Sequence, residues 1–441
     1  MRIEIITIGD ELLLGFTIDT NGAHLARELA AVGVTIARRS SVGDGAEEIA
    51  AAVREALDRT GAVITTGGLG PTADDLTKPS IAALFGRGMV LDESILAALE
   101  ARWTARFARD MPASNRQQAM LPDGARVLVN RHGSAPGVWL EDERGRWVAM
   151  LPGVPREMRG MLADELGPIV AQRARAEFGG EGAVVRSRTL RTTSIAESAI
   201  ADRLGELARG VEGCSLAYLP GREGTDLRLT LRGRPAAEAD AVLARAADLV
   251  RARVADWVYG EGDADLAAVV LDRCRARGLT IAVAESCTGG LLGARLTSVA
   301  GSSEVVRGGV IAYANDVKSA QLGVDAGVIA SDGAVSERVA LQMAAGARAR
   351  ISAGVGVALT GVAGPGGGSA EKPVGTVWIG VDVAGEARAV RNVFIGDREE
   401  IRFRAAQFAM DLVRRALTPG ANPSPTPNDA VAAAGGSRGA R

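Results

Sequence analysis

Histidine and lysine are scarce in this chain of 441 residues. Its two histidines, His24 and His132, both lie in the first third, so we do not expect a histidine base in the last third. Only three of the 51 basic residues are lysines, namely Lys78, Lys318 and Lys372. Arginine stays protonated at any working pH, whereas lysine can release its proton. Each remaining lysine is therefore a candidate for amine-specific chemistry.

The chain also has few cysteines, no long apolar run and almost no net charge. The three cysteines, Cys214, Cys274 and Cys287, are odd in number and not spaced as metal ligands, which suits a reducing compartment. No apolar run approaches the ~20 residues of a membrane span, and the first residues resemble a strand rather than a signal peptide. The net charge of −2 lacks the basic surplus typical of nucleic-acid binding. We expect a cytoplasmic globular protein that contacts neither membrane nor nucleic acid directly.

The order of apolar patterns indicates several domains. Residues 1–167 alternate strands and helices, which predicts a parallel sheet covered on both faces. Residues 168–258 predict a small α+β module, interpreted as a spacer, and residues 259–417 a second alternating α/β unit. Residues 418–441, rich in Pro, Gly, Ala and Ser, are predicted to be disordered. The predicted fold is two three-layer α/β domains with parallel-rich sheets, joined by the small α+β module.

A serine marks the last α/β unit. In the stretch AESCTGGLLGARL, Ser286 directly follows a buried strand and precedes a helix, at the sheet edge where open α/β sheets bind ligands. The free backbone N–H groups of the helix start could hold an oxyanion. Two alternatives are that Ser286 only caps the helix and that Cys287 is the nucleophile. We interpret Cys287 as a buried cysteine that acts as a small apolar residue.

A serine nucleophile needs a base. The nearest lysine, Lys318, follows the next strand in the stretch GGVIAYANDVKSAQLG, together with Tyr313. A desolvated, neutral lysine can serve a serine as its base, and the alternative is a solvated surface lysine. A third strand runs into the glycine-rich loop 361–368, whose backbone N–H groups could approach a phosphate.

Together these motifs resemble the CinA family, and specifically its C-terminal nicotinamide mononucleotide deamidase domain. The resemblance rests on ESCTGG, on the Tyr-x-Asn-x-x-Lys run, and on TGVAGP with KPVGTV. It implies that Ser286 is the nucleophile, assisted by Lys318 and Tyr313. The implied reaction converts nicotinamide mononucleotide and water to nicotinate mononucleotide and ammonia without a cofactor. The implied substrate-binding residues are Thr288, Gly289, Gly290, Asn315, Thr360, Gly361, Gly364, Gly366 and Gly367.

The N-terminal unit carries a second set of motifs. GDELLLG occupies positions 9–15, Asp44 follows a predicted strand, and TTGGLGPTADDLTKP occupies 65–79. The glycines after a buried strand could bring N–H groups to a phosphate. Asp74 and Asp75 could hold a divalent cation that bridges phosphate oxygens. An aspartate that caps a helix is the alternative.

With SNRQQAMLP (114–122), NRHGSAPG (130–137) and LPGVPREM (151–158), these motifs resemble the CinA N-terminal domain, which is related to molybdopterin-binding domains. The resemblance implies ADP-ribose pyrophosphatase activity that depends on Mg, Mn or Co, with Asp44, Asp74 and Asp75 at the metal. The implied phosphate and substrate contacts are Gly9, Asp10, Glu11, Asn21, Gly67, Gly68, Gly70, Thr72 and Lys78. The alternative is a domain that only binds a molybdopterin-like or nucleotide phosphate ligand.

The central module resembles the family's KH-like insert, with Ser194 where the family commonly has glycine. It lacks the GXXG loop of RNA-binding KH domains, so we do not expect RNA binding by that route. The family name leaves open a competence or DNA-repair adaptor, against which the charge balance argues. The resemblance also implies a homodimer.

Overall fold

The computed structural model describes residues 1–178 and 184–418, so almost all of the predicted disordered tail lies outside the described residues. The chain divides into two compact units, each described by itself below. The first comprises residues 1–186 and 231–241, and the second residues 187–230 and those from 242 onward. Within the described ranges, no helix combines the length and apolar character that crossing a membrane requires.

The first unit is built on a six-stranded sheet in the order β2-β1-β3-β8-β7-β6. The strands β2, β1, β3 and β8 are parallel, whereas β7 and β6 are antiparallel additions at one side. The bounds are β1 (Arg2–Ile8), β2 (Thr35–Val42), β3 (Ala62–Thr66), β6 (Arg126–Leu128), β7 (Gly137–Glu141) and β8 (Trp147–Leu151). The prediction of a parallel-rich sheet is confirmed.

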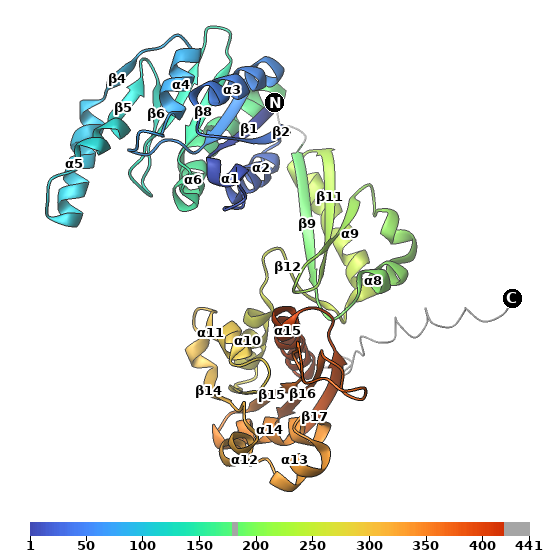
Figure 1. Ribbon diagram of the computed structural model, residues 1–441. Helices are drawn as coiled ribbons and strands as arrows, with labels where there is room; N and C mark the ends of the chain where they lie inside the picture. Colours follow the sequence, from blue (N-terminus) through green and yellow to red (C-terminus); the bar gives the residue numbers. More distant parts are fainter. Residues whose placement is uncertain (179–183, 419–441) are drawn as a thin grey trace. The chain divides into compact units, whose positions relative to one another are not determined.

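Helices cover both faces of this sheet (Figure 1). On one face lie α2 (Thr20–Ala31), α6 (Pro155–Met161) and α7 (Gly167–Phe178), and on the other α3 (Ala46–Thr60) and α4 (Thr77–Leu84). Strand alternation explains the two cores, because Ile3 and Ile5 pack with the first set and Ile6 and Ile8 with the second. Val170 of α7 belongs to the first core, so the helix beyond the predicted boundary at 167 packs with the N-terminal domain.

Further elements complete the first unit. They are α1 (Asp10–Leu13), β4 (Met89–Leu91), α5 (Glu93–Phe107), η1 (Ala113–Ala119), β5 (Met120–Pro122) and η2 (Leu162–Leu166). The strands β4 and β5 pair as a separate two-stranded sheet.

The small module has a four-stranded sheet in the order β10-β11-β9-β12. Its elements are β9 (Val184–Thr192), α8 (Glu197–Leu204), η3 (Gly205–Arg209), β10 (Ser215–Pro220), β11 (Thr225–Arg234), α9 (Ala236–Val254) and β12 (Val258–Glu261). These strands and helices form the small α+β module that the sequence predicts. Ser194 has a φ of 61°, a left-handed conformation that glycine adopts freely and other L-residues rarely. The backbone therefore explains why glycine suits this position.

The C-terminal domain contains a five-stranded sheet in the order β14-β13-β15-β16-β17. The first three strands are parallel, and β16 and β17 continue the sheet antiparallel. The strand bounds are β13 (Ile281–Glu285), β14 (Val306–Ile311), β15 (Val355–Gly361), β16 (Thr376–Val383) and β17 (Glu386–Val393).

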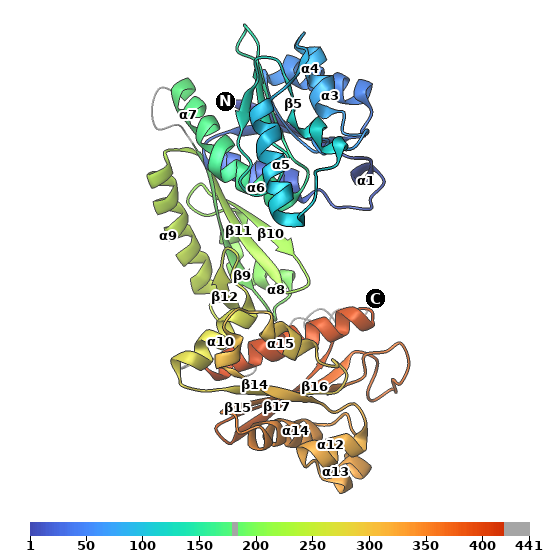
Figure 2. The ribbon, with the colours of Figure 1, turned by 90° about the vertical axis from the view of Figure 1, so that its left-hand side faces the viewer.

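Helices sandwich this sheet as well (Figure 2). One face is covered by α10 (Leu266–Ala276), α11 (Leu291–Thr297) and α15 (Arg398–Ala416), and the other by α12 (Asn315–Leu322), α13 (Ala326–Asp332) and α14 (Glu337–Arg350). The short helix η4 (Ser302–Glu304) precedes β14. The predicted pair of α/β domains is confirmed.

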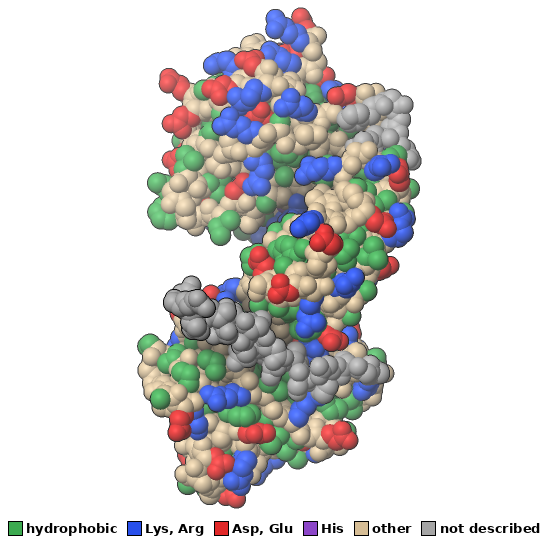
Figure 3. All heavy atoms as spheres, turned by 90° about the vertical axis from the view of Figure 1, so that its right-hand side faces the viewer, with side chains coloured by type: hydrophobic (Ala, Val, Ile, Leu, Met, Phe, Trp, Pro, Cys, Tyr) green, Lys and Arg blue, Asp and Glu red, His purple; other side chains and the backbone are tan. Residues whose placement is uncertain are grey.

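The parallel strands β13, β14 and β15 bring three sequence motifs to one edge, because their carboxyl ends lie on the same side of the sheet. Ser286 follows β13, the stretch with Tyr313 and Lys318 follows β14, and the glycine-rich loop follows β15. On the face shown in Figure 3, acidic and basic side chains are interspersed, in keeping with the balanced charge of the chain.

Candidate functional site

Ser286 lies in the first position after β13, before a turn that leads into α11. Its backbone N–H donates to the carbonyl of Leu359 on the neighbouring strand β15, at 2.9 Å. This bond continues the sheet through the serine and fixes its backbone. The side chain is 8% exposed, so the hydroxyl sits in a largely water-free environment.

Lys318 of α12 points its ammonium at this serine. Its Nζ lies 3.2 Å from Ser286 Oγ, 2.9 Å from the carbonyl oxygen of Ala312 and 3.1 Å from that of Tyr313. The residue is 1% exposed, and burial lowers the pKa of Lys318 below its usual value because the charged form loses its hydration. A neutral amine has two N–H groups and one lone pair. In that form the two carbonyls can accept the two N–H groups, which leaves the lone pair to accept from the Ser286 hydroxyl, whereas the protonated amine donates to all three oxygens.

Glu285, which immediately precedes the serine, is buried and accepts three backbone hydrogen bonds from the next turn. The donors are the N–H groups of Gly290, Leu292 and Gly293, at 3.0, 3.0 and 2.8 Å. The expectation that the N–H groups of the helix start are free for an oxyanion is therefore wrong for these three. Sequence reasoning missed this function of Glu285.

The N–H groups that remain near the serine belong to the turn itself. Gly289 N–H donates to the carbonyl of Ser286 at 3.1 Å, whereas those of Cys287 and Thr288 find no acceptor among the described residues. They lie next to the hydroxyl in sequence, as two adjacent donors do in an oxyanion hole. Gly289 and Gly290 have φ of 60° and 95°, which the turn requires and glycine provides.

Cys287 is a poor rival nucleophile. Its side chain is 6% exposed, and burial raises the pKa of its thiol to about 12. Because the thiolate is the reactive form, this raised pKa disfavours Cys287 as the nucleophile. The interpretation of Cys287 as a small buried apolar residue agrees with its burial.

The side chain of Tyr313 is exposed to solvent and is not directed at Ser286 and Lys318. Its hydroxyl accepts a hydrogen bond from Arg398 Nη2 at 3.1 Å, and Arg398 Nη1 donates to the carbonyl of Gly364 at 2.7 Å. One turn further along α15, Arg402 Nη2 donates to the carbonyl of Thr288 at 2.7 Å. Two arginines of α15 thus contact the serine turn, the tyrosine and the glycine-rich loop. Sequence reasoning missed both, because single arginines do not stand out in an arginine-rich chain.

The remaining predicted substrate contacts differ in their exposure. Thr360 is buried, and its hydroxyl donates to the carbonyl of Ala334 at 2.7 Å. The hydroxyl proton is therefore engaged within the protein and is not offered to a substrate. Asn315 is exposed at the start of α12. Gly366 and Gly367 are exposed in the loop after β15, whereas a side chain at Gly361 would collide with the Thr376 carbonyl.

In the N-terminal domain, Asp10 and Asp44 are interlocked. Asp10 N–H donates to Asp44 Oδ2 at 3.0 Å, and Asp44 N–H donates to Asp10 Oδ1 at 3.3 Å. Asn21 is buried and donates to the carbonyl of Gly153 at 2.7 Å, while its Oδ1 has no partner among the described residues. Gly9 and Glu11 flank Asp10 at the start of α1. The segments after β1 and β2 and the start of α2 therefore hold these predicted residues at one edge of the sheet, where Asn21 is bonded to the loop after β8.

Asp75 organises its own loop. Its carboxylate accepts from Gly70 N–H at 2.7 Å, Thr72 N–H at 2.8 Å and the Thr72 hydroxyl at 2.5 Å. Over the described ranges, no three His, Cys, Asp or Glu side chains gather as a metal-binding group, and Asp44, Asp74 and Asp75 are no exception. A cation bound by one or two of these carboxylates would need substrate phosphate oxygens as further ligands, which is the usual coordination of Mg²⁺.

The nearby glycines and Lys78 have packing functions. A Cβ at Gly67 would lie 2.1 Å from the carbonyl oxygen of Ile8, and one at Gly68 2.1 Å from Thr77 Oγ1. Lys78 is buried, and its Nζ donates to the carbonyls of Gln117 and Gln118 at 2.9 and 3.1 Å. Burial lowers the pKa of Lys78 to about 8.

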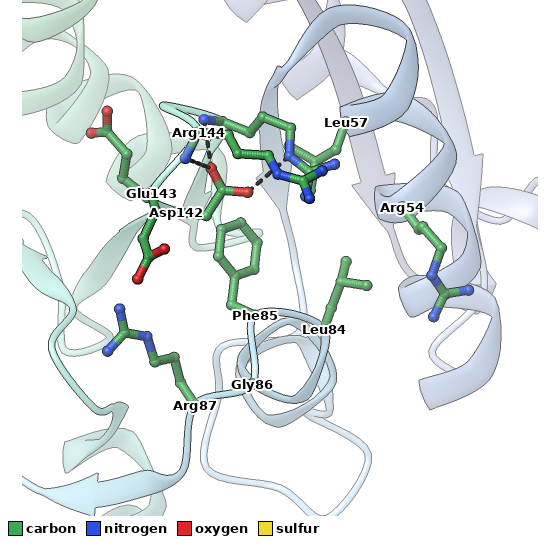
Figure 4. Close-up of a pocket in the computed structure, with 11 residues that line it drawn as sticks. Arg54, Leu57, Leu84, Phe85, Gly86, Arg87, Asp142, Glu143 and Arg144 are labelled. Carbon is green, nitrogen blue, oxygen red and sulfur yellow. Dashed lines mark hydrogen bonds and ion pairs between the residues drawn. The ribbon is translucent and has the colours of Figure 1, made fainter.

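A cavity of about 520 Å³ in the first unit contains none of the predicted site residues (Figure 4). It is lined by the ends of α3 and α4 and by the turn between β7 and β8. Arg146 forms ion pairs with Asp142 at 2.8 Å and with Asp58 at 3.2 Å. Part of the charge of this cavity is thus neutralised by its own side chains, and we assign the cavity no function.

Comparison with known proteins finds three successive domains in the chain. The CinA C-terminal domain matches residues 263–417, the probable molybdopterin binding domain 4–172, and the damage-inducible protein CinA KH domain 187–260. A CinA-like protein of Gemmatimonas aurantiaca is 65% identical over 95% of this chain and 96% of its own length. A CinA-like protein of Salinibacter ruber is 43% identical over 95% and 100%. A competence/damage inducible protein of Agrobacterium tumefaciens, known as a crystal structure, is 44% identical over 34% of this chain and 93% of its own, with a TM-score of 0.34.

Proposed function

This chain belongs to the CinA family, and we propose that its C-terminal domain hydrolyses nicotinamide mononucleotide to nicotinate mononucleotide and ammonia. The observation that carries the proposal is the contact between Lys318 Nζ and Ser286 Oγ at 3.2 Å, inside a buried site that favours the neutral amine. A neutral lysine is the base that a serine nucleophile needs where no histidine is near.

In the proposed reaction, Ser286 Oγ attacks the carboxamide carbon while its proton passes to Lys318 Nζ. The oxyanion that forms is stabilised by the N–H groups of Cys287 and Thr288, the two donors of the turn that have no acceptor among the described residues. Lys318 then returns the proton to the nitrogen of the leaving ammonia. An ester on Ser286 remains, and a water molecule activated by Lys318 hydrolyses it to release the carboxylate.

Arg398 and Arg402 are suited to hold the phosphate of such a substrate. Arg402 uses one nitrogen, on the Thr288 carbonyl, and Arg398 uses two, on the Gly364 carbonyl and the Tyr313 hydroxyl. These bonds hold each guanidinium in place and leave further N–H donors. Guanidinium groups bind phosphate through paired, charge-assisted hydrogen bonds. This arrangement favours a nucleotide over free nicotinamide.

The proposal is tested by measuring ammonia release from nicotinamide mononucleotide, with nicotinamide as the substrate that lacks ribose and phosphate. The full-length protein should release ammonia from the nucleotide, and Ser286→Ala should not. Ser298→Ala is the matched control, because that hydroxyl only bonds the Arg295 carbonyl within α11 and its turn. Release of ammonia at the wild-type rate by Ser286→Ala would exclude the serine mechanism.

For the N-terminal domain, a second candidate function is metal-dependent hydrolysis of ADP-ribose. It is supported by the interlocked acids Asp10 and Asp44, which lie with Asn21 at the sheet edge where α/β domains bind ligands. One or two of the carboxylates of Asp44, Asp74 and Asp75 would hold the cation together with substrate phosphates, and the cation would supply charge to the pyrophosphate.

Asp44→Asn and Asp74→Asn test this second function better than Asp75→Ala, because loss of Asp75 also releases Gly70 and Thr72. Formation of AMP and ribose 5-phosphate would be followed with Mg²⁺, Mn²⁺ or Co²⁺. Loss of this activity with unchanged deamidation supports it. No hydrolysis by the wild type with any of the three metals would leave a domain that only binds its ligand.

A further inference from the structure

The small module contacts the C-terminal domain through the hairpin turn between β10 and β11. This turn, residues 220–224, has the sequence PGREG. Most of the small module belongs to the same compact unit as the C-terminal domain. Side chains of the turn form ion pairs with α15 and α11, contacts that a mere spacer would not need.

The backbone of the turn is fixed. Gly221 N–H donates to the carbonyl of Gly224 at 2.8 Å, which closes the turn. A Cβ at Gly224 would lie 2.0 Å from the carbonyl oxygen of Thr192, so glycine lets the turn pack directly on the end of the neighbouring strand β9. Arg222 and Glu223 are therefore presented from a backbone that is held at both ends.

The helix α15 contacts the turn along one side. Glu399, Phe403 and Gln407 are spaced four residues apart and so lie on the same side of the helix. Arg222 Nη2 donates to Glu399 Oε1 at 2.7 Å, and its guanidinium lies over the ring of Phe403, 4.6 Å from the centroid. Gln407 Nε2 donates to the Glu223 carbonyl at 3.2 Å. The turn thus holds the first half of α15.

The carboxylate of Glu223 links the module to α11. It forms ion pairs with Arg191 of β9 at 2.5 Å and with Arg295 of α11 at 3.4 Å. The side chains of Arg191, Glu223 and Arg295 are 18%, 33% and 15% exposed, so water screens these pairs less than on an open surface. Arg295 also lies 3.6 Å from Asp265, and its guanidinium is 5.1 Å from the centroid of the Phe403 ring. Glu223 therefore acts on both α11 and the ring of α15.

These two helices carry the proposed amidohydrolase site. The helix α11 follows the turn of Ser286, and α15 carries Arg398 and Arg402. Each arginine stands one position before a residue of the contacting side, a rotation of about 100° around the helix. A shift of α15 would therefore move both arginines. Paired hydrogen bonds from a guanidinium to phosphate depend on its placement.

We propose that Arg222 and Glu223 are positioning residues for the amidohydrolase site. They fix α15 so that Arg398 and Arg402 are held where they meet the phosphate of the substrate. The inference rests on the proposed function for the identity of that substrate. It gives the small module a function beyond that of a spacer, and the effect it predicts depends on the phosphate.

The test is a calorimetric titration of the full-length protein with the product, nicotinate mononucleotide, because its binding requires no turnover. Nicotinate riboside is the matched ligand without phosphate. Glu223→Gln and Phe403→Leu should each raise the Kd of the nucleotide about 5–10-fold, as expected when one charge-assisted contact to phosphate is partly lost. The Kd of the riboside should stay within twofold of the wild type.

Glu212→Gln is the matched control, because its ion pair with Arg245 at 3.2 Å lies wholly within the small module. It should change the Kd of neither ligand. Glu223→Gln keeps the size of the side chain, and circular dichroism should show all variants folded. The positioning proposal is overturned if the wild type does not bind the nucleotide, if Glu223→Gln binds it like the wild type, or if Glu223→Gln weakens both ligands equally.

Ammonia release from nicotinamide mononucleotide by the wild type is measured alongside. A wild type that binds the product but releases no ammonia would refute the amidohydrolase. The positioning proposal would still be supported in that case if Glu223→Gln weakened the nucleotide alone. The two proposals can therefore fail separately.

Discussion

Lys318 Nζ lies 3.2 Å from Ser286 Oγ, although 32 residues separate the two along the chain. The parallel pairing of β13 with β14 produces this contact, because it places the ends of the two strands side by side. The Ala312 and Tyr313 carbonyls then fix the direction in which the amine points. The amine is thus oriented by backbone groups that cannot rotate away, so its chemistry can be tested by changing the side chain alone.

Lys318→Arg should lower the rate of deamidation by about 10²–10⁴-fold, the usual contribution of a general base. Arginine keeps the positive charge but stays protonated, so it cannot accept the proton of Ser286. The measurement is kcat for ammonia release from nicotinamide mononucleotide. Lys372→Arg is the matched control, since that ammonium only donates to the Asp332 carbonyl within the described residues. A Lys318→Arg enzyme within about threefold of the wild type would refute the base assignment.

The wild-type activity should rise with pH along a limb that belongs to Lys318. Only the neutral amine can act as base, and burial lowers the pKa of Lys318 from its usual value near 10.5. Activity is therefore gained as pH rises through that lowered pKa, and lost as pH falls below it. The measurement is kcat/KM across the neutral and alkaline range, with Lys318→Ala as the variant whose residual activity should lack the limb. A wild-type profile identical to that of Lys318→Ala would contradict the assignment.

Glu285→Gln should lower kcat by about tenfold or more and change KM little. The carboxylate holds three N–H groups of the turn after Ser286, and an amide cannot accept all three equally well. Misplacing the turn would move the N–H groups of Cys287 and Thr288, and losing one oxyanion donor typically costs about 10²–10³-fold. Unfolding experiments should show a loss of about 1–3 kcal/mol. A destabilised variant with unchanged kcat would limit Glu285 to a structural function.

The sequence predicted the edge of the C-terminal sheet well, because its signals are local. A strand followed by Ser286 and a glycine pair, and a strand followed by Lys318, each show in a short window, and parallel pairing brings them together. Arg398 could not be predicted in this way. It reaches the site from α15, far along the chain, and nothing in the sequence around Arg398 marks its contacts with the Gly364 carbonyl and the Tyr313 hydroxyl.

Glu285 and Asp75 show a second limit of prediction from the sequence. Both are carboxylates beside glycines at the end of a strand, a pattern that suggests ligand chemistry. In each case the carboxylate accepts hydrogen bonds from its own loop, at Gly290 and Gly293 for the first and Gly70 for the second. Whether backbone N–H groups are free for a ligand depends on three-dimensional loop geometry, which the spacing of residues does not determine.

Ser194→Gly should stabilise the small module. The serine has a φ of 61°, which costs an L-residue about 1–2 kcal/mol, and its buried hydroxyl has no partner among the described residues. Glycine removes both penalties but gains up to about 1 kcal/mol of chain entropy in the unfolded state. The net gain should be about 0.5–1 kcal/mol, measured by chemical denaturation. Ser187→Gly, in the middle of β9, should destabilise instead. A loss of stability in Ser194→Gly would show that the hydroxyl has a partner in solution.

Arg398→Gln should raise KM for nicotinamide mononucleotide about 10–100-fold and leave kcat within a few-fold of the wild type. A charge-assisted contact to phosphate contributes about 1.5–3 kcal/mol, and this contact is made equally before and during the reaction. Nicotinamide riboside lacks the phosphate, so its kcat/KM should hardly change in the variant. Arg404→Gln is the matched control, because Arg404 lies on the same helix and has only the ion pair with Glu400 at 3.9 Å. If Arg398→Gln lowered kcat/KM equally for both substrates, the arginine would act through Tyr313 and the Gly364 loop, which it holds by hydrogen bonds, and not through the phosphate.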